Sequence, residues 1–443
     1  SGGTTVSAGT LAVSDGAAMG TGSVTVDGEL DLSGGITVGN DLTLDDATGN
    51  AIVNVSGSNT LSGNITLAAG SDIDVPNAAD TLTLTGVLAG SGGVIKTSAG
   101  TLEYAGTAPD TYTGTTAVSA GMLALDVTGG TALAGPLAIG GTGTVRDLAA
   151  IQISGQPVSI TGAGATLDLN DNNDMVGGLT MDGGTISLGA GTLALSTSVT
   201  INGNQGATAT ITGTTGSLAL VASPITFDVS STGRSSDLDI QAPLTGPGGL
   251  TKSGSGTMEL DAAGTYTGTT TIGQGTLDVT ASGALGTGTV AVEDPAILLI
   301  DGTSGPVSLS NALTLNSTAN ELSSIAGSNT LSGPITLERD ASFDVVSSTL
   351  TISGAIGESG GHFGVTKIGS GTLVYGSEQA NTYTGTTTVS YGELDLDSSA
   401  SHGALAGPLV ISDNPSILAE VRYLADNQLP STTDVSVIGS QAA

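Results

Sequence analysis

Short runs of alternating apolar and polar residues fill this chain from end to end. Ser23–Val26 (SVTV), Thr81–Leu84 (TLTL) and Thr276–Val279 (TLDV) are typical. A period of two places one face of an extended segment in a core and the other face outside. Gly, Asn, Asp or Ser bounds each run, which predicts short β-strands joined by turns. Helical periodicity is nearly missing, and its best candidate is Ile417–Asn427, for which we expect a short helical turn or a loop.

One sequence unit occurs three times. Lys96–Leu125, Lys252–Val279 and Lys367–Leu396 share a pattern of the form KxGSGTLxY…TYTGTTTVxxGxLDL, and Ser1–Val13 matches only its second half. Such self-similarity is the signature of a solenoid, in which each unit buries its apolar face on its neighbours. A β-sandwich would need long-range pairing and a closed strand count, whereas a parallel β-helix needs only rungs stacked about 4.8 Å apart. The repeats therefore favour an all-β parallel β-helix.

A longer period overlies the short unit. The segment Gly57–Leu67 (GSNTLSGNITL) returns at Gly327–Leu337 (GSNTLSGPITL), an offset of 270 residues. We predict one continuous β-solenoid over residues 1–443, with no Pro- or Ser-rich linker. Its repeat units are predicted at 1–13 (a half copy), 90–126, 246–280 and 357–397; residues 1–150 recur as 267–443, and 150–266 form spacer rungs.

The repeated unit resembles the autotransporter-associated β-strand repeat, also called the passenger-associated transport repeat. The resemblance implies a right-handed parallel β-helix, elongated as a rod, that is exported and displayed on a bacterial surface or shed from it. It is specific for the architecture and weak for activity. The second copy carries the pattern on Leu250, Lys252, Gly254, Gly256, Thr257, Met258, Leu260, Tyr266, Thr267, Gly268, Thr270, Ile272, Gly275 and Leu277.

Composition narrows the classes of function. Aromatic residues make up 2% of the chain and Trp is absent, so the core must be aliphatic, while 71 glycines suit the many turns. The 40 acidic residues outnumber the 7 basic ones and give a net charge of −33. Such a surface repels nucleic acid and anionic lipid, which bind through Lys and Arg. No apolar run reaches the 18 residues of a membrane span, so we expect no direct membrane insertion of this segment.

Cysteine is absent, so cysteine content does not indicate the cellular compartment. We infer the compartment from the resemblance instead. The chain begins at Ser, inside a repeat and without a signal peptide. We expect a piece of a larger exported precursor, secreted or held at the bacterial cell surface.

Residues that recur in every copy are interpreted first as structural residues of the repeat and only second as binding or catalytic residues. Lys96, Lys252 and Lys367 are interpreted as turn residues whose stems cover the rung above, with an array of anion sites as the alternative. The repeated tyrosines have two interpretations. Exposed in a row, they could stack on sugars; alternatively, each packs against the solenoid. The weak candidates for glycan binding are Tyr112, Tyr266 and Tyr383.

One segment has the spacing of a calcium loop. Oxygen-bearing side chains alternate along it, as hard ligands around one ion would. The sixth position is Asn173 rather than Gly and the twelfth is Leu179 rather than Glu, so a turn between strands is the alternative. The weak calcium candidates are Asp168, Asn170, Asn172 and Asp174; no other cofactor is expected.

Catalytic signals are sparse. His362 and His402 are the two histidines, and neither lies in a serine-nucleophile motif. Residues 338–340 (Glu-Arg-Asp) form a tight acid–base–acid cluster, but adjacent strand residues point to opposite faces. We therefore predict that the chain is not an enzyme.

The leading hypothesis is a structural stalk, fibre or surface-layer segment. Open rungs at the two ends would template further strands, which predicts end-to-end self-association into oligomers or filaments. The alternative is an adhesin that binds glycans or a host surface. A carbohydrate-active β-helix enzyme is a third possibility and would need an acid cluster in a groove, most plausibly within 150–266.

Overall fold

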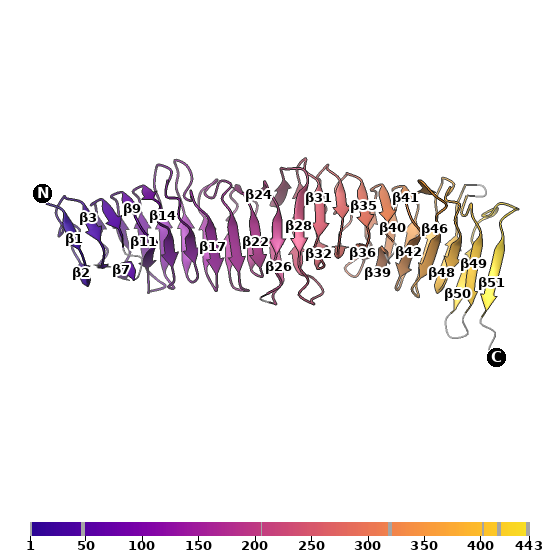
Figure 1. The fold of residues 1–443 in the computed structure, drawn as a ribbon, viewed down its shortest axis with the longest axis horizontal. Helices are drawn as coiled ribbons and strands as arrows, with labels where there is room; N and C mark the ends of the chain where they lie inside the picture. The colour runs from indigo at the N-terminus through magenta and orange to yellow at the C-terminus, as the bar shows by residue number, and fades with distance from the viewer. Residues whose placement is uncertain are drawn as a thin grey trace. The chain divides into compact units, whose positions relative to one another are not determined.

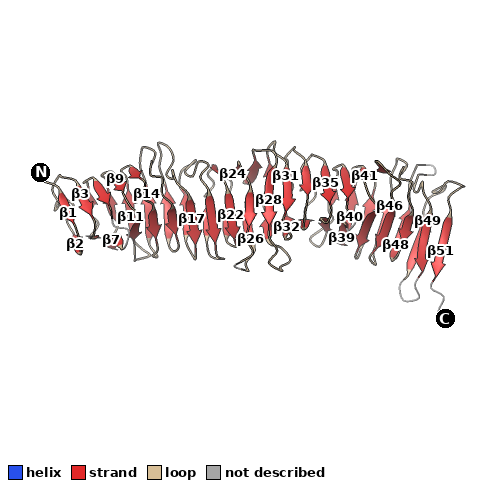
Figure 2. Ribbon diagram, in the orientation of Figure 1, coloured by secondary structure: helices blue, strands red, loops and turns tan. Residues whose placement is uncertain are grey.

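A computed structural model gives the fold of two compact units, Ser1–Ala219 (unit 1) and Leu220–Ala443 (unit 2). In both units the chain coils into successive turns of short strands (Figures 1 and 2). The residues that the structure describes are 2–45, 49–204, 206–317, 321–400, 403–413 and 418–439.

Unit 1 is a parallel β-solenoid with three ladders of strands. Within a sheet, each inner strand pairs in parallel with the strand one turn earlier and the strand one turn later. The first ladder is interrupted. One sheet contains β1 (Thr4–Val6), β3 (Val24–Val26), β6 (Leu42–Leu44), β9 (Ile65–Leu67) and β12 (Leu88–Gly90), and a separate sheet contains β21 (Asp174–Val176) and β24 (Thr192–Leu195). The second contains β2 (Thr10–Val13), β4 (Glu29–Ser33), β7 (Asn50–Ser56), β10 (Ser71–Asp74), β13 (Val94–Lys96), β15 (Thr116–Val118), β17 (Leu137–Gly140), β19 (Val158–Thr161), β22 (Leu179–Asp182) and β25 (Val199–Ile201). The third contains β5 (Thr37–Val38), β8 (Asn59–Leu61), β11 (Thr81–Leu84), β14 (Thr101–Tyr104), β16 (Met122–Leu125), β18 (Thr144–Asp147), β20 (Thr166–Asp168), β23 (Thr185–Ser187) and β26 (Ala209–Thr212).

Unit 2 repeats this arrangement, and β27 (Ser217–Leu220) spans the boundary between the units. One ladder is again interrupted: β30 (Leu244–Thr245) belongs to one sheet, and a separate sheet contains β37 (Ser308–Leu309), β40 (Ser328–Leu331), β43 (Thr349–Ile352), β46 (Thr372–Tyr375), β48 (Gly392–Leu396) and β50 (Ala419–Tyr423). The next contains β28 (Ile225–Val229), β31 (Leu250–Ser253), β33 (Thr270–Ile272), β35 (Val290–Glu293), β38 (Leu313–Asn316), β41 (Ile335–Leu337) and β44 (Ile356–Glu358). The last contains β29 (Leu238–Ile240), β32 (Thr257–Leu260), β34 (Thr276–Val279), β36 (Ile297–Asp301), β39 (Leu322–Ala326), β42 (Ala341–Val345), β45 (Val365–Ile368), β47 (Thr387–Val389), β49 (Leu409–Asp413) and β51 (Val435–Gly439).

The alternating sequence pattern produces the core directly. In β11, Leu82 and Leu84 are buried while Thr81 and Thr83 are partly exposed, because successive Cβ atoms leave opposite faces of a strand. The strands pair in register, so that Leu82 stacks on Leu102 one turn later. Each turn thereby covers the apolar row of the turn before it, and the all-β parallel solenoid predicted from the repeats is confirmed.

The described residues contain no helix, and hence none with the length and apolar character needed to cross a membrane. The helical turn or loop expected at 417–427 is wrong in its central part, because residues 419–423 form β50. Arg422 of this strand pairs in register with Asp395 of β48. Tertiary pairing with the preceding turn overrides a weak local helical pattern here.

The repeated unit does not always lie on the same ladder. Starting at Lys252, five successive parallel pairings in one ladder lead through β33, β35, β38 and β41 to Glu358 of β44. Lys367 lies one strand further, in the ladder that in the previous copy contains Thr257–Leu260. Two successive copies in unit 2 are therefore separated by five turns and one face of the solenoid.

Corresponding polar residues of the long period make corresponding contacts. The side-chain oxygen of Asn59 accepts a hydrogen bond from the backbone N–H of Ile36 at 2.7 Å, and that of Asn329 accepts one from Val307 at 2.9 Å. Both asparagines are buried. A buried backbone N–H at a corner needs a partner, which these side chains supply inside each unit.

Candidate functional site

The three repeated lysines lie in strands, not in turns as predicted. Lys96 ends β13, Lys252 lies in β31 and Lys367 lies in β45, and all three side chains point inward and are fully buried. Their strand register places them at core positions, because each stacks in line with apolar residues of the neighbouring turns. A buried ammonium group is unavailable to an external anion, so the alternative of an anion-binding array has no support in this geometry.

Each lysine instead binds the backbone of two adjacent turns. The ammonium of Lys252 donates to the carbonyl oxygens of Ser253 at 2.9 Å, Gly254 at 2.8 Å and Gln274 at 3.1 Å. The last carbonyl belongs to the corner one turn later, so one cation links two stacked corners. Burial lowers the pKa of both Lys252 and Lys367 to about 8. Lys367 donates in the same way to the carbonyls of Ile368, Gly369 and Tyr391 at 2.7, 2.7 and 3.0 Å, and Lys96 to those of Ser98 and Ala120.

The three repeated tyrosines are also buried. Tyr112, Tyr266 and Tyr383 have no exposed surface, and the hydroxyl of each lies 2.5 Å from the hydroxyl of the threonine four residues later. Burial raises the pKa of Tyr266 and of Tyr383 to about 12. A ring without exposed surface offers no face on which a sugar can stack. The geometry therefore favours the alternative, in which each tyrosine ring packs inside the solenoid, over glycan binding at these positions.

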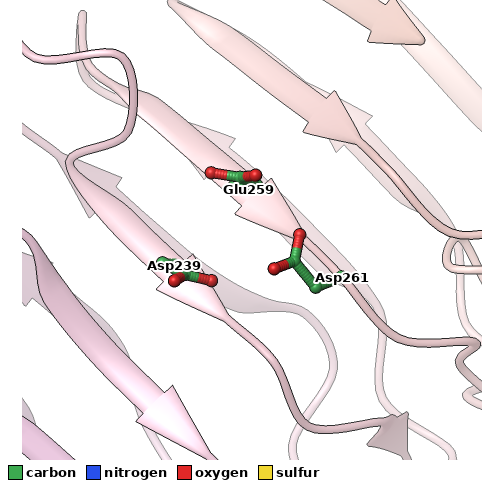
Figure 3. Close-up of side chains that lie close together, drawn as sticks. All are labelled: Asp239, Glu259 and Asp261. Carbon is green, nitrogen blue, oxygen red and sulfur yellow. The ribbon is translucent and has the colours of Figure 1, made fainter. Parts of the chain in front are cut away.

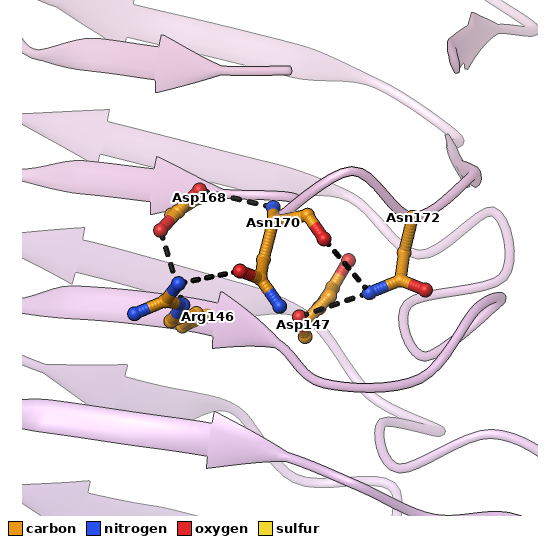
Figure 4. A network of polar contacts seen from close by, with 5 residues as sticks. All are labelled: Arg146, Asp147, Asp168, Asn170 and Asn172. Carbon is orange, nitrogen blue, oxygen red and sulfur yellow. Dashed lines mark hydrogen bonds and ion pairs between the residues drawn. The ribbon is translucent and has the colours of Figure 1, made fainter. Parts of the chain in front are cut away.

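The suggested calcium loop does not gather its side chains around one point. Asp168 forms an ion pair with Arg146 across adjacent turns, Nε to Oδ2 at 3.3 Å, and Asn170 also contacts Arg146 (Figure 4). Asn172 turns its amide nitrogen toward the backbone oxygens of Asp147, at 3.1 Å, and Asn170, at 3.2 Å. Positive φ angles at Asn170 and at the next residue make a tight turn, which is the alternative stated for this segment.

Asp174, the fourth candidate, serves a different corner. Its carboxylate accepts backbone N–H groups from Gln152 and Ile153 at 2.8 Å, Ser154 at 3.0 Å and Met175 at 2.6 Å. Four donors satisfy its oxygens and cap the irregular segment of the preceding turn. The sequence spacing alone could not reveal this, because the donors come from residues about 20 positions earlier.

Arg422 of β50 forms a second ion-paired contact between adjacent turns. Arg422 binds Asp395 through two hydrogen bonds, Nε to Oδ1 at 2.8 Å and Nη2 to Oδ2 at 2.7 Å, and also contacts Glu393. Arg146 holds the matching place in the first copy, one turn after the repeat. The recurring VRDLA and VRYLA segments were the available signal.

Of the candidates for catalysis, Asp340 and His362 line one open pocket, while Arg339 turns to a different partner. Arg339 donates to Asn316 at 3.1 Å, and the neighbouring Asp340 accepts the backbone N–H of Gly364 at 2.7 Å, so the two do not act together. The Nδ1 atom of His362 lies 2.6 Å from the hydroxyl of Thr384 on an exposed corner. His402 lies outside the described residues.

Comparison with known proteins supports the repeat. The passenger-associated transport repeat family matches residues 1–13, 94–125, 250–279 and 365–396, which fall within the predicted repeat units. The chain is also similar to the adhesin BmaC autotransporter of Brucella suis biovar 1 (strain 1330), with 30% identity over 458 aligned residues. The alignment covers 91% of this chain and 12% of the relative's length.

Proposed function

We propose that this chain, which matches the passenger-associated transport repeat at four places, is a scaffold segment of an autotransporter passenger at the bacterial cell surface. The relative is an autotransporter named as an adhesin, and this chain corresponds to a small part of it. A non-enzymatic role fits the same assignment. The observation that carries the proposal is that the repeated lysines and tyrosines are buried and bind backbone or hydroxyl groups inside the solenoid.

The scaffold role rests on the inward direction of the repeated side chains. Lys252, Tyr266 and their counterparts fill the core and bind backbone or neighbouring hydroxyl groups, so their recurrence is explained by folding. The surface between them is acidic, with a net charge of −33 for the whole chain. Such charge keeps a large repeat protein soluble and discourages lateral association.

Hydrodynamics and electron microscopy test the scaffold proposal. We expect purified chain to sediment with a high frictional ratio and to form particles of uniform, elongated outline in negative stain. A compact particle with the sedimentation coefficient of a sphere of this mass would contradict a stalk.

Adhesion is a second candidate, favoured by the name of the relative. Beads coated with the chain would be tested on host-cell monolayers and on a glycan array, beside beads coated with an acidic protein of similar charge. Reproducible binding above that control would support a direct adhesive surface. Equal binding would leave adhesion to other parts of a passenger.

End-to-end stacking into oligomers remains part of the structural proposal. Val435 and Val437 of β51 pair in register with Leu409 and Ile411 of β49, yet 49% and 68% of their respective surfaces are exposed. An uncovered apolar row and a strand edge favour addition of another strand. Sedimentation velocity over a concentration series should show growing species, and V437E should reduce them. A concentration-independent monomer would contradict stacking.

A further inference from the structure

An outward-facing ladder in unit 2 carries acidic residues without the partners found in the equivalent ladders of the other copies. Asp239 of β29 pairs in register with Glu259 of β32, and Glu259 with Asp278 of β34. Asp261 follows β32 directly, and Figure 3 shows its carboxylate beside those of Asp239 and Glu259. One oxygen from each of these three side chains lies within 4.8 Å of the others.

In the other copies the neighbouring turn presents a hydroxyl or a guanidinium group to the matching acid, whereas in the second copy it presents another acid or a leucine. In the first copy, Glu103 occupies the place of Glu259 and accepts a hydrogen bond from Thr83 at 2.8 Å. In the third copy, Asp395 occupies the place of Asp278 and binds Arg422 of the next turn. The next turn of the second copy instead presents Leu299 to Asp278.

The surroundings of Asp278 independently indicate that its carboxylate lacks a partner. Only 8% of its surface is exposed, and its Oδ1 has no hydrogen-bond partner among the described residues. It lies next to Glu259 on the same face, where Glu259, Asp301 and Asp261 all act on it electrostatically. A buried carboxylate in such surroundings needs a proton or a cation.

Hydrogen bonds occupy only part of the accepting capacity of the three clustered carboxylates; Glu259 bonds the side chain of Ser236. Asp239 Oδ2 accepts a hydrogen bond from Gln241 at 2.7 Å, while its Oδ1 has no partner among the described residues. Asp261 accepts one from Thr280 at 2.6 Å. None of the ion pairs of the described residues includes any of these carboxylates.

We propose that Asp239, Glu259 and Asp261 bind a divalent cation, Ca²⁺, with Asp278 as the buried charge beside it. Carboxylate oxygens are hard ligands that suit Ca²⁺, whose coordination is flexible and tolerates ligands from several strands. No nitrogen or sulfur ligand is present in the cluster, which disfavours Zn²⁺ and Cu²⁺. The cluster adjoins Asp278 from the preceding turn, whereas Arg422 of the third copy adjoins Asp395 from the following turn.

Protons compete for the same carboxylates. Burial, followed by the charges of Asp261 and Asp239, raises the pKa of Glu259, and burial and the neighbouring acids raise the pKa of Asp278 to about 7. Binding of Ca²⁺ near pH 7 should therefore release protons, which titrations in two buffers with different ionisation enthalpies would detect.

Isothermal titration of the chelator-treated full chain with CaCl₂ alone tests the proposal. We expect one site per chain with a dissociation constant on the order of 10⁻⁴–10⁻³ M, the range of extracellular calcium modules. E259Q and D261N should each weaken binding about tenfold or more, since each removes a charged ligand. E103Q removes the same charge from the matching position of the first copy and should leave affinity unchanged.

A second variant distinguishes a specific calcium site from the general attraction of calcium to an acidic surface. L299R places a guanidinium beside Asp278, as Arg422 lies beside Asp395. It should neutralise Asp278, weaken calcium binding and raise the unfolding temperature in calcium-free buffer. Equal losses in E259Q and E103Q, or the absence of measurable binding by the unmodified chain, would overturn the proposal. Equal affinity for Mg²⁺ would overturn the assignment to Ca²⁺. Far-UV circular dichroism confirms folding of each variant.

Discussion

At the scale of single residues, the repeat places polar groups where a β-solenoid has unmet backbone needs. The corner after each lysine-bearing strand points carbonyl groups inward, and a parallel strand beside it cannot reach them. Lys252 reaches these oxygens because its long stem crosses the core and its ammonium has three donors. The same logic explains why the tyrosines recur with a threonine four residues later.

Replacing Lys252 with methionine tests this role. K252M keeps most of the buried stem but leaves three carbonyls without their shared donor. We expect a loss of about 1–3 kcal/mol in the free energy of unfolding, the usual range for unsatisfied buried groups. Chemical denaturation measures it, with Arg234→Met as a control that also removes one positive charge, at an exposed position. An unchanged unfolding free energy in K252M would refute the role of the ammonium as a corner cap.

At the scale of strands and corners, the stacking of turns limits which residue can form a corner. Gly275 has φ +66° and lies directly over the corner of the previous turn, where an added Cβ would come within 2.5 Å of the carbonyl oxygens of Gly254 and Gly256. Gly9 is its counterpart in the half copy, with φ +72°, and an added Cβ there would meet no atom within 4 Å. The conformations match, but the surroundings differ.

This pair separates backbone strain from stacking. G9A should cost about 1–2 kcal/mol for the left-handed conformation alone. G275A has the same strain and also overpacks the corner, which adds about 1–3 kcal/mol. Thermal and chemical unfolding of the two single variants in the full chain measures the difference. Similar losses of unfolding free energy in both variants would mean that adjacent turns in unit 2 can separate enough to accommodate a methyl group.

The strands were easier to predict than the placement of the repeated side chains. Alternation of Thr and Leu in segments such as Thr81–Leu84 is a local pattern that survives into the structure, because the core needs one apolar row per strand. The burial of Lys96 was not predicted, because lysine is almost never buried and its carbonyl partners lie in two turns. The alternating Asp and Asn residues from Asp168 imitate a calcium loop, but Arg146, 22 residues earlier, is a stronger partner for Asp168. The acid ladder at Glu259 also needed the register, since its members come from three strands.

At the scale of the whole molecule, buried ionisable groups link stability to pH. Burial raises the pKa of Asp110 to about 7, of Asp147 to about 9 and of Glu321 to about 8. Each carboxyl starts from an ordinary value near 4 in the unfolded chain, so the folded state holds more protons above that pH. The free energy of unfolding must then fall as pH rises from about 4 toward 7. The lysines act oppositely, but only between about 8 and 10.5, where the unfolded chain holds more protons.

The expected outcome is a higher unfolding temperature at pH 5 than at pH 7.5. Each kcal/mol of lost stability should lower the unfolding temperature of a unit of this size by about 2–4 °C. Calorimetry at both pH values gives the comparison. Repeating it at 1 M salt, where the Debye length is about 3 Å, screens repulsion among exposed acids and leaves the buried groups. Greater stability at pH 7.5 would contradict the protonation of these carboxyls in the folded state.

The displacement of one repeat by a single face has a consequence for recognition. Five turns and one strand separate Lys252 from Lys367, so identical surface motifs of the second and third copies look out in different directions from unit 2. An antibody raised against the shared TYTGTT segment would find its epitope on two differently oriented faces of the solenoid. A single flat layer of receptors would engage only one of these two faces. Sequence repetition in this protein therefore multiplies the directions of display rather than the avidity for a single plane.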